Sequence, residues 1–174
     1  MFFFRIFVSE IYSVSDCIIA NVNVSNTGTS VNDKVYLIGY DEIADLSSID
    51  FEMEWTFRVT AYGCDVCLGA SSEVSVTPIK TNYRVLLGNN GSGQIRYGYR
   101  TDSTYASLGS TISRNTDIPM KIVKNGSSFN YYVNGNLVGS KTVSFWTDYD
   151  MFGLYLLQWN TGTTTISNLK IKPL

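Results

Sequence analysis

Histidine is absent from this 174-residue chain, and its absence excludes several kinds of chemistry. Histidine is the commonest general base, the usual partner of a catalytic serine or cysteine, and a frequent ligand of transition metals. Basic runs are also absent, and 13 Lys and Arg stand against 15 Asp and Glu, for a net charge of -2. We therefore expect no nucleic-acid partner, because a phosphate backbone is bound by a cationic surface.

Long hydrophobic runs are missing as well. A membrane-spanning helix needs about 20 apolar residues. The apolar run at residues 1–8 is shorter than that, is interrupted by Arg5 and lacks a basic segment before it, so it makes a poor signal peptide. We expect a first strand there and no insertion into a membrane.

Cysteine is scarce, with only Cys17, Cys64 and Cys67. An odd, small number argues against a framework of disulfides. The pair Cys64 and Cys67 has C-x-x-C spacing, but a zinc site would need two further ligands, and the one remaining Cys without any His cannot supply a usual set. On an extended segment the two side chains point to opposite faces. We expect them to be packing residues or, alternatively, a strained local disulfide.

The residues that are plentiful indicate one folded domain over residues 1–174. Apolar residues make up 44% of the chain and charged residues 16%, enough to build a core. Aromatic residues make up 14%, and the 12 tyrosines suit both strands and surfaces that contact sugar or protein. No helical periodicity of useful length appears. Apolar runs separated by Gly, Asn, Asp and Ser predict strands at 2–8, 17–24, 34–40, 50–61, 64–69, 83–88, 94–100, 104–109, 118–124, 128–133, 137–143, 151–158 and 164–172.

The clearest alternation lies in residues 50–61. One face carries Phe51, Met53, Trp55, Phe57 and Val59, and the other carries Asp50, Glu52, Glu54, Thr56 and Arg58. This pattern is typical of a strand with one buried and one solvated face. Residues 151–157 are apolar on both faces, which predicts a central strand covered on both sides.

Turn signals favour a meander of hairpins. Asn125-Gly126 and Asn134-Gly135 each separate two apolar runs, and a third candidate turn lies within 87–93. Asn-Gly is typical of the type I′ turn, in which both central residues have positive φ. Many short antiparallel strands joined in this way predict a sandwich or a barrel.

Residues 120–126 and 129–138, with the sequence Tyr-Val-Asn-Gly at 132–135, resemble the laminin-G-like superfamily. The segment 166–174 resembles the closing strand of that family, and 51–55 its early Trp-containing strand. The resemblance implies an all-β fold, a two-sheet antiparallel jelly-roll sandwich of the concanavalin A-like type with about 12–13 strands. Members of the superfamily include lectins, glycan-binding modules, adhesion domains, parts of virus tail fibres and glycosidases, so the fold does not fix the function.

The carboxylates of residues 50–54 leave an enzymatic alternative open. Retaining β-glucanases of this fold carry Glu-x-Asp-x-Glu on such a strand, with the first residue as nucleophile and the last as acid/base. Here Asp50, Glu52 and Glu54 occupy these positions with the first two residue types exchanged. Two carboxyls about 5–5.5 Å apart would flank the scissile bond. The competing interpretation is an ordinary polar strand face.

Carbohydrate or a surface protein is the partner that this composition favours. Sugar faces stack on aromatic rings, and charged or amide groups bond the hydroxyls. The residues predicted to contact such a ligand are Glu52, Glu54, Arg58, Tyr97, Tyr99, Trp146, Tyr149 and Trp159. Trp146 is a candidate because it lies in an expected loop, 144–150. Core packing is the alternative for Tyr97 and Tyr99.

No cofactor is expected, with one reservation. Asp148 and Asp150 are weak candidates for calcium, an ion that needs 6–8 oxygen ligands, so backbone carbonyls would have to complete the shell. We therefore predict a non-enzymatic recognition module at a cell or virion surface, belonging to a longer chain or an assembly. The alternatives are a glycosidase acting through Glu52 and Glu54, and a structural viral or adhesin domain.

Overall fold

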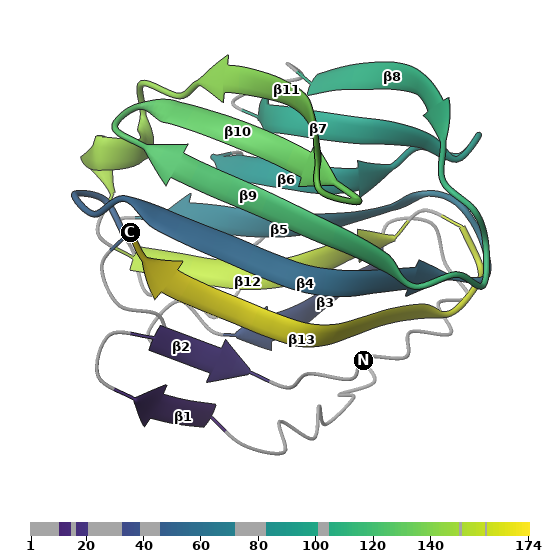
Figure 1. The fold of residues 1–174 in the computed structure, drawn as a ribbon, viewed down its shortest axis with the longest axis horizontal. Coiled ribbons are helices and arrows are strands. Elements are labelled where there is room, and N and C mark those ends of the chain that lie inside the picture. Colours follow the sequence, from purple (N-terminus) through teal and green to yellow (C-terminus); the bar gives the residue numbers. More distant parts are fainter. Residues whose placement is uncertain are drawn as a thin grey trace.

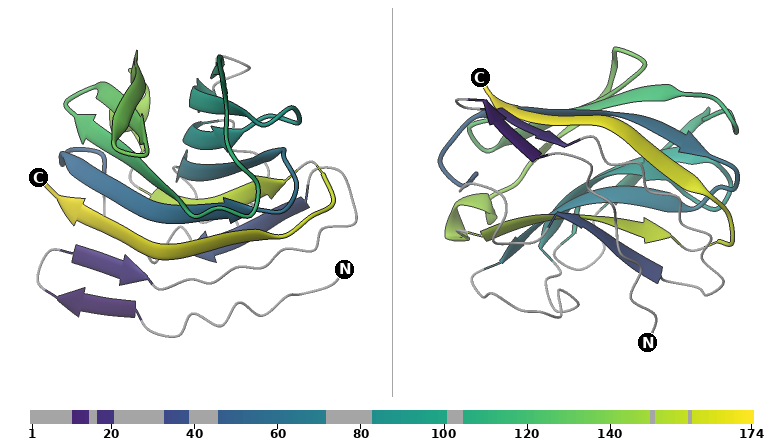
Figure 2. Two further views of the ribbon diagram at one scale, coloured as in Figure 1. Left: turned by 45° about the vertical axis from the view of Figure 1, so that its right-hand side comes forward. Right: turned by 90° about the horizontal axis from the view of Figure 1, so that it is seen from below.

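The computed structural model describes residues 11–14, 17–20, 33–38, 46–71, 83–100, 105–149, 151–158 and 160–174. These segments form two antiparallel sheets packed face to face (Figures 1 and 2), which confirms the predicted all-β jelly-roll sandwich. The only helical element among them is a single 3-10 turn, η2 (Trp146–Asp148). The strand expected at 2–8 lies outside the described residues.

One sheet has seven strands and the other has six. The seven-stranded sheet has the order β1 (Ile11–Val14), β2 (Cys17–Ala20), β13 (Thr164–Pro173), β4 (Phe51–Val59), β9 (Ile118–Asn125), β10 (Ser128–Val133) and β11 (Asn136–Thr142). The six-stranded sheet has the order β3 (Asp33–Ile38), β12 (Met151–Gln158), β5 (Cys64–Ser71), β6 (Arg84–Asn89), β7 (Gln94–Arg100) and β8 (Tyr105–Thr111). Strand β1 was not expected from the sequence.

The core lies between the sheets. Along β4 the side chains alternate between buried and partly exposed, and Phe51, Trp55 and Phe57 are all on the buried side. Strands β9 and β10 repeat this alternation beside it. The outer face of the seven-stranded sheet is therefore the solvated one, as the pattern at 50–61 predicts.

The strands β12, β5 and β6 of the six-stranded sheet are buried on both faces. Strand β12 lies between β3 and β5, and its side chains from Phe152 to Gln158 are all buried, as predicted for 151–157. Neighbouring β5 places Cys64 in the main core and Cys67 on the opposite face. Both cysteines are free, so of the two alternatives packing is correct.

The predicted hairpins are present, with one change of turn type. Asn134 and Gly135 form a two-residue turn and both have positive φ, which matches type I′. At the other site Asn125 still pairs with Ser128, and only Gly126 has positive φ. Positive φ at the first central residue alone is the type II′ pattern, so the type I′ prediction for Asn125-Gly126 is wrong.

Valine at either turn glycine should destabilise the domain by about 1 kcal/mol or more. The φ values of Gly126 and Gly135 are 57° and 75°, and an added Cβ would meet nothing within 4 Å at either position. The cost therefore comes from backbone strain alone. Chemical unfolding of Gly126→Val and Gly135→Val tests this, with Gly135→Asn as the control, since asparagine tolerates positive φ. Equal stability of valine and asparagine at 135 would contradict the turn assignment.

Candidate functional site

Lysines pair with the carboxylates on the outer face of β4. Glu52 accepts from Lys121 at 3.0 Å and from Lys172 at 2.9 Å. Glu54 lies 3.7 Å from Lys170. Register places Lys170 opposite Glu54 and Lys172 opposite Glu52 on β13. Lys121 stands opposite Glu54 on β9 and pairs diagonally with Glu52. Opposite charges on neighbouring strands stabilise the sheet by about 0.2–1 kcal/mol for each pair.

Glu52 stays ionised in this setting. Partial burial would raise its pKa, but hydrogen bonds from Lys172 and Lys121, together with their positive charges, hold the pKa below the ordinary value. A general acid of a glycosidase needs the opposite shift, because it must carry a proton near neutral pH. Glu52 is therefore an ion-pair partner and not a proton donor, whereas the family pattern gives the acid/base position to Glu54, which lies beside Lys170.

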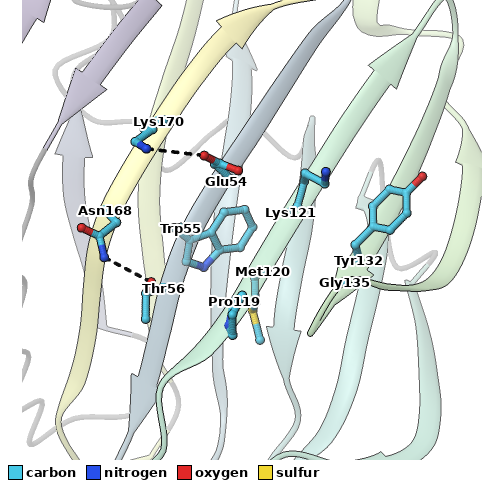
Figure 3. Close-up of a pocket in the computed structure, with 10 residues that line it drawn as sticks. All are labelled: Glu54, Trp55, Thr56, Pro119, Met120, Lys121, Tyr132, Gly135, Asn168 and Lys170. Atoms are coloured by element: carbon cyan, nitrogen blue, oxygen red, sulfur yellow. Dashed lines mark hydrogen bonds and ion pairs between the residues drawn. The ribbon is translucent and has the colours of Figure 1, made fainter.

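A hollow of about 290 Å³ opens beside Glu54 on this outer face, here called the β4–β9 hollow (Figure 3). Its size is close to the lower end of small-molecule sites, roughly 300 Å³. Strands β13, β4, β9 and β10 contribute to it, together with the turn at Gly135. The residues that line it are Glu54, Trp55, Thr56, Pro119, Met120, Lys121, Tyr132, Gly135, Asn168 and Lys170.

Polar groups and an aromatic ring surround the β4–β9 hollow. Figure 3 shows Lys170, Glu54 and Lys121 in succession across the sheet, with Tyr132 beyond them. Lys121 Nζ lies 5.3 Å from the centre of the Tyr132 ring. Asn168 has a positive φ of 54° within the irregularity of β13. The hollow thus combines donors, an acceptor and a ring surface, the groups that bind hydroxylated ligands.

Asp50 and Arg58 lie away from the β4–β9 hollow. Asp50 precedes β4, and its Oδ1 accepts from the Gly126 amide at 2.7 Å and lies 3.5 Å from Lys124 Nζ. This carboxylate therefore holds the β9–β10 turn. Arg58 pairs with Asp117 at 3.3 Å, and both side chains are largely exposed. Neither residue is placed to act on a ligand beside Glu54.

Tyr97 and Tyr99 point into the molecule. Both pack against the main core, with the Tyr97 ring 5.3 Å from that of Tyr131 and the Tyr99 ring 5.8 Å from that of Phe145. Since they alternate with the buried Arg96 on β7, they occupy the inner side of the six-stranded sheet. Of the two alternatives, core packing describes these rings, which are partly buried.

Trp146 is a core residue. Only 1% of it is exposed, its indole Nε1 donates to the Leu46 carbonyl at 2.9 Å, and its ring lies 4.9 Å from that of Phe152. The prediction of an exposed ligand contact in a loop is therefore wrong, because η2 turns the indole between the sheets. Tyr149 is half-buried against Tyr83, with ring centres 4.9 Å apart. Partial burial and the hydrogen bond with Tyr83 raise the pKa of Tyr149 to about 12.

Two of the predicted positions, Trp159 and Asp150, lie outside the described residues. Asp148 is exposed at the end of η2. Within the described ranges, no three His, Cys, Asp or Glu side chains are grouped so that they would hold a metal ion. Calcium binding through Asp148 and Asp150 stays a prediction.

A second charged cluster lies on the face of the six-stranded sheet that is directed away from the main core. The cluster is buried there. Asp65 is 0% exposed and lies 3.4 Å from Arg96, with Arg84 also buried nearby. Gly88 stands between Asp65 and Arg96 in the ladder, and a Cβ there would come within 2.7 Å of Asp65. Complete burial raises the pKa of Asp65 to about 7, although the charges of Arg96 and Arg84 lower it. Because it is enclosed, this cluster is not an open binding surface.

Among the predicted ligand contacts that the structure describes, Glu54 alone lines the β4–β9 hollow. Sequence reasoning missed Lys121, Tyr132, Asn168 and Lys170. A local signal existed for Tyr132, because it alternates with the apolar Phe129, Tyr131 and Val133 and therefore faces outward. No local signal indicated that these residues meet, because they come from strands that are far apart in the sequence.

No protein-family model and no curated protein matches this sequence. Solved structures do match. The carbohydrate recognition domain of Emp46p has 11% identity and a TM-score of 0.60, and covers 91% of this chain and 88% of that one. The corresponding domain of Emp47p has 12% identity and a TM-score of 0.56, covering 97% and 93%. Carbohydrate-binding module CBM66 from Bacillus subtilis has 12% identity and a TM-score of 0.52, covering 92% and 84%.

The chain therefore has the fold of a lectin-like β-sandwich, which solved carbohydrate-binding domains share. At identities of 11% to 12% the likeness establishes the fold, and the ligand has to be argued from the site. No helix among the described segments is long and apolar enough to span a membrane.

Proposed function

We propose that this chain is a non-enzymatic carbohydrate-recognition domain that binds glycan in the β4–β9 hollow. The observation that carries this proposal is the hollow itself, with Glu54, Lys121 and Lys170 around it and the ring of Tyr132 at one side. Sugars present both hydroxyls and apolar C–H faces, so an aromatic ring beside charged donors and acceptors suits them. The fold shared with carbohydrate-binding domains supports the same class of ligand.

The glycosidase alternative receives no support from the geometry. Asp50, in the place of the nucleophile, is bonded to the Gly126 amide. Glu54, in the place of the acid/base, lies 3.7 Å from Lys170, and Glu52 between the two positions is held by two lysines with a lowered pKa. A retaining mechanism needs one free nucleophilic carboxylate and one protonated carboxyl across the same bond. Binding without turnover is therefore the function that we propose.

The finer assignments belong to the same proposal. The segment 129–138, with its Asn134-Gly135 turn, supports a relationship to laminin-G-like domains of the concanavalin A-like type. Such a module would act outside the cell or on a virion surface, as part of a longer chain or an assembly. Its carbohydrate ligand would then be carried by a surface glycoprotein.

Replacing Tyr132 with alanine should weaken glycan binding about tenfold, because stacking on the ring is lost. Glycan-array screening of the wild type identifies a ligand, and calorimetry then compares the variants. Arg58→Ala is the control, since Arg58 lies on the same sheet face but does not line the hollow. Absence of glycan binding, or equal losses in both variants, would contradict the proposed site.

A further inference from the structure

The charges around the β4–β9 hollow indicate which class of sugar it binds. Lys170, Glu54 and Lys121 stand opposite one another on β13, β4 and β9, and Tyr132 continues the row on β10. Glu54 is therefore an acceptor placed between two ammonium donors. Its side chain is 39% exposed, so a ligand in the hollow can reach its carboxylate.

Both lysines of this row already have an acidic partner. Lys121 lies 3.0 Å from Glu52, and Lys170 lies 3.7 Å from Glu54. Lys172, one position further along the face, lies 2.9 Å from Glu52. Every ammonium thus has a carboxylate partner before any ligand arrives, although the three lysines share two carboxylates and keep one positive charge in excess.

A carboxylated or sulfated sugar would be attracted by the one excess positive charge, but it would find no ammonium without a carboxylate partner. To gain an ion pair it would have to displace Glu52 or Glu54 from a lysine, and it would approach the exposed charge of Glu54. Like charges at close range are repulsive and raise the cost of binding. An uncharged sugar avoids both costs, because its hydroxyls accept from an ammonium and donate to a carboxylate while the ion pairs remain.

We infer that the β4–β9 hollow selects an uncharged sugar residue, with two neighbouring hydroxyls bound at Glu54. One hydroxyl donates to the Glu54 carboxylate, and the adjacent one accepts from Lys170 or Lys121. The ring of Tyr132 then faces the C–H groups of the same sugar. This inference rests on the proposed function, and it adds that Glu54 determines specificity.

The test uses pairs of oligosaccharides that differ only at carbon 6. Gluco-, manno- and galacto-oligosaccharides are each compared with the hexuronate counterpart of the same length and linkage, by calorimetry on the full chain. We expect a neutral member to bind at least about tenfold more tightly than its acidic partner. Glu54→Gln should weaken binding of the neutral sugar about tenfold, because a charged acceptor is lost. It should also reduce the difference in affinity between the neutral sugar and its hexuronate counterpart.

Asp117→Asn is the matched control, because it also neutralises an exposed carboxylate on this domain but lies outside the β4–β9 hollow. It should leave both affinities unchanged. Equal or tighter binding of the hexuronate, lost in Tyr132→Ala, would overturn the selectivity while leaving the proposed function intact. Neutral binding that Glu54→Gln does not weaken would overturn the role of Glu54. If no member of any pair binds, the proposed function fails and this inference fails with it.

Discussion

Replacing Trp146 with alanine is expected to destabilise the domain by about 3–5 kcal/mol. The indole is among the largest fully buried side chains and lies against the rings of Phe51, Phe129 and Phe152. Alanine would leave a cavity between the sheets and an unpaired carbonyl at Leu46. Equilibrium unfolding in urea measures the loss, provided that the variant folds.

Trp146→Phe separates packing from hydrogen bonding. Phenylalanine keeps most of the ring contacts and loses the bond to Leu46 together with the smaller part of the packing, so we expect a smaller cost, about 1–2 kcal/mol. Glycan binding by this variant should equal that of the wild type, since Trp146 does not line the β4–β9 hollow. A stable Trp146→Ala protein with weakened glycan binding would instead support the loop contact that the sequence suggested.

The second large effect is a loss of stability as the pH rises from about 4 to about 7. The pKa of Asp65 is raised by burial from 3.8 to about 7, whereas an unfolded chain releases this proton near 3.8. Between the two values the folded protein holds a proton that the unfolded chain has lost, so stability is highest at the acid end and falls with pH. The full change is up to about 4 kcal/mol.

Asp65→Asn is the control for this effect, because the amide cannot titrate. Urea unfolding of both proteins at a series of pH values from about 4 to about 8 gives the difference in stability. The wild type should lose stability relative to Asp65→Asn across this window. A relative gain of stability with rising pH would mean that the ion pair with Arg96, 3.4 Å away, outweighs burial and lowers the pKa of Asp65.

Local patterns in the sequence were sufficient for most of the strands that the structure describes and for the faces of β4. Alternation placed Phe51 and Trp55 inside and Glu52 and Glu54 outside, because side chains on a strand change face at every residue. The apolar run at 151–157 identified a strand buried on both sides, and Asn134-Gly135 identified a hairpin through its backbone preference.

Tertiary structure decided everything that depends on which strands are neighbours. Trp146 looked like a loop residue, and η2 turns it into the core, where it contacts Phe51 from a distant strand. Asp65 carries a charged side chain, yet it is fully buried in the six-stranded sheet beside Arg96. Burial by distant segments leaves no trace in a local pattern, so the sequence did not indicate either outcome.

The sequence by itself indicated a sandwich or a barrel with a solvated strand face at Glu52, Glu54 and Arg58, because alternation and turn chemistry are properties of adjacent residues. The two-sheet jelly roll was implied by the resemblance to laminin-G-like domains. The binding hollow was decided only by the order β13–β4–β9–β10. That order sets Lys170, Glu54, Lys121 and Tyr132 side by side, although Glu54 and Lys170 are more than a hundred positions apart along the chain. Strand order results from packing the whole chain around one core, and no short segment encodes it.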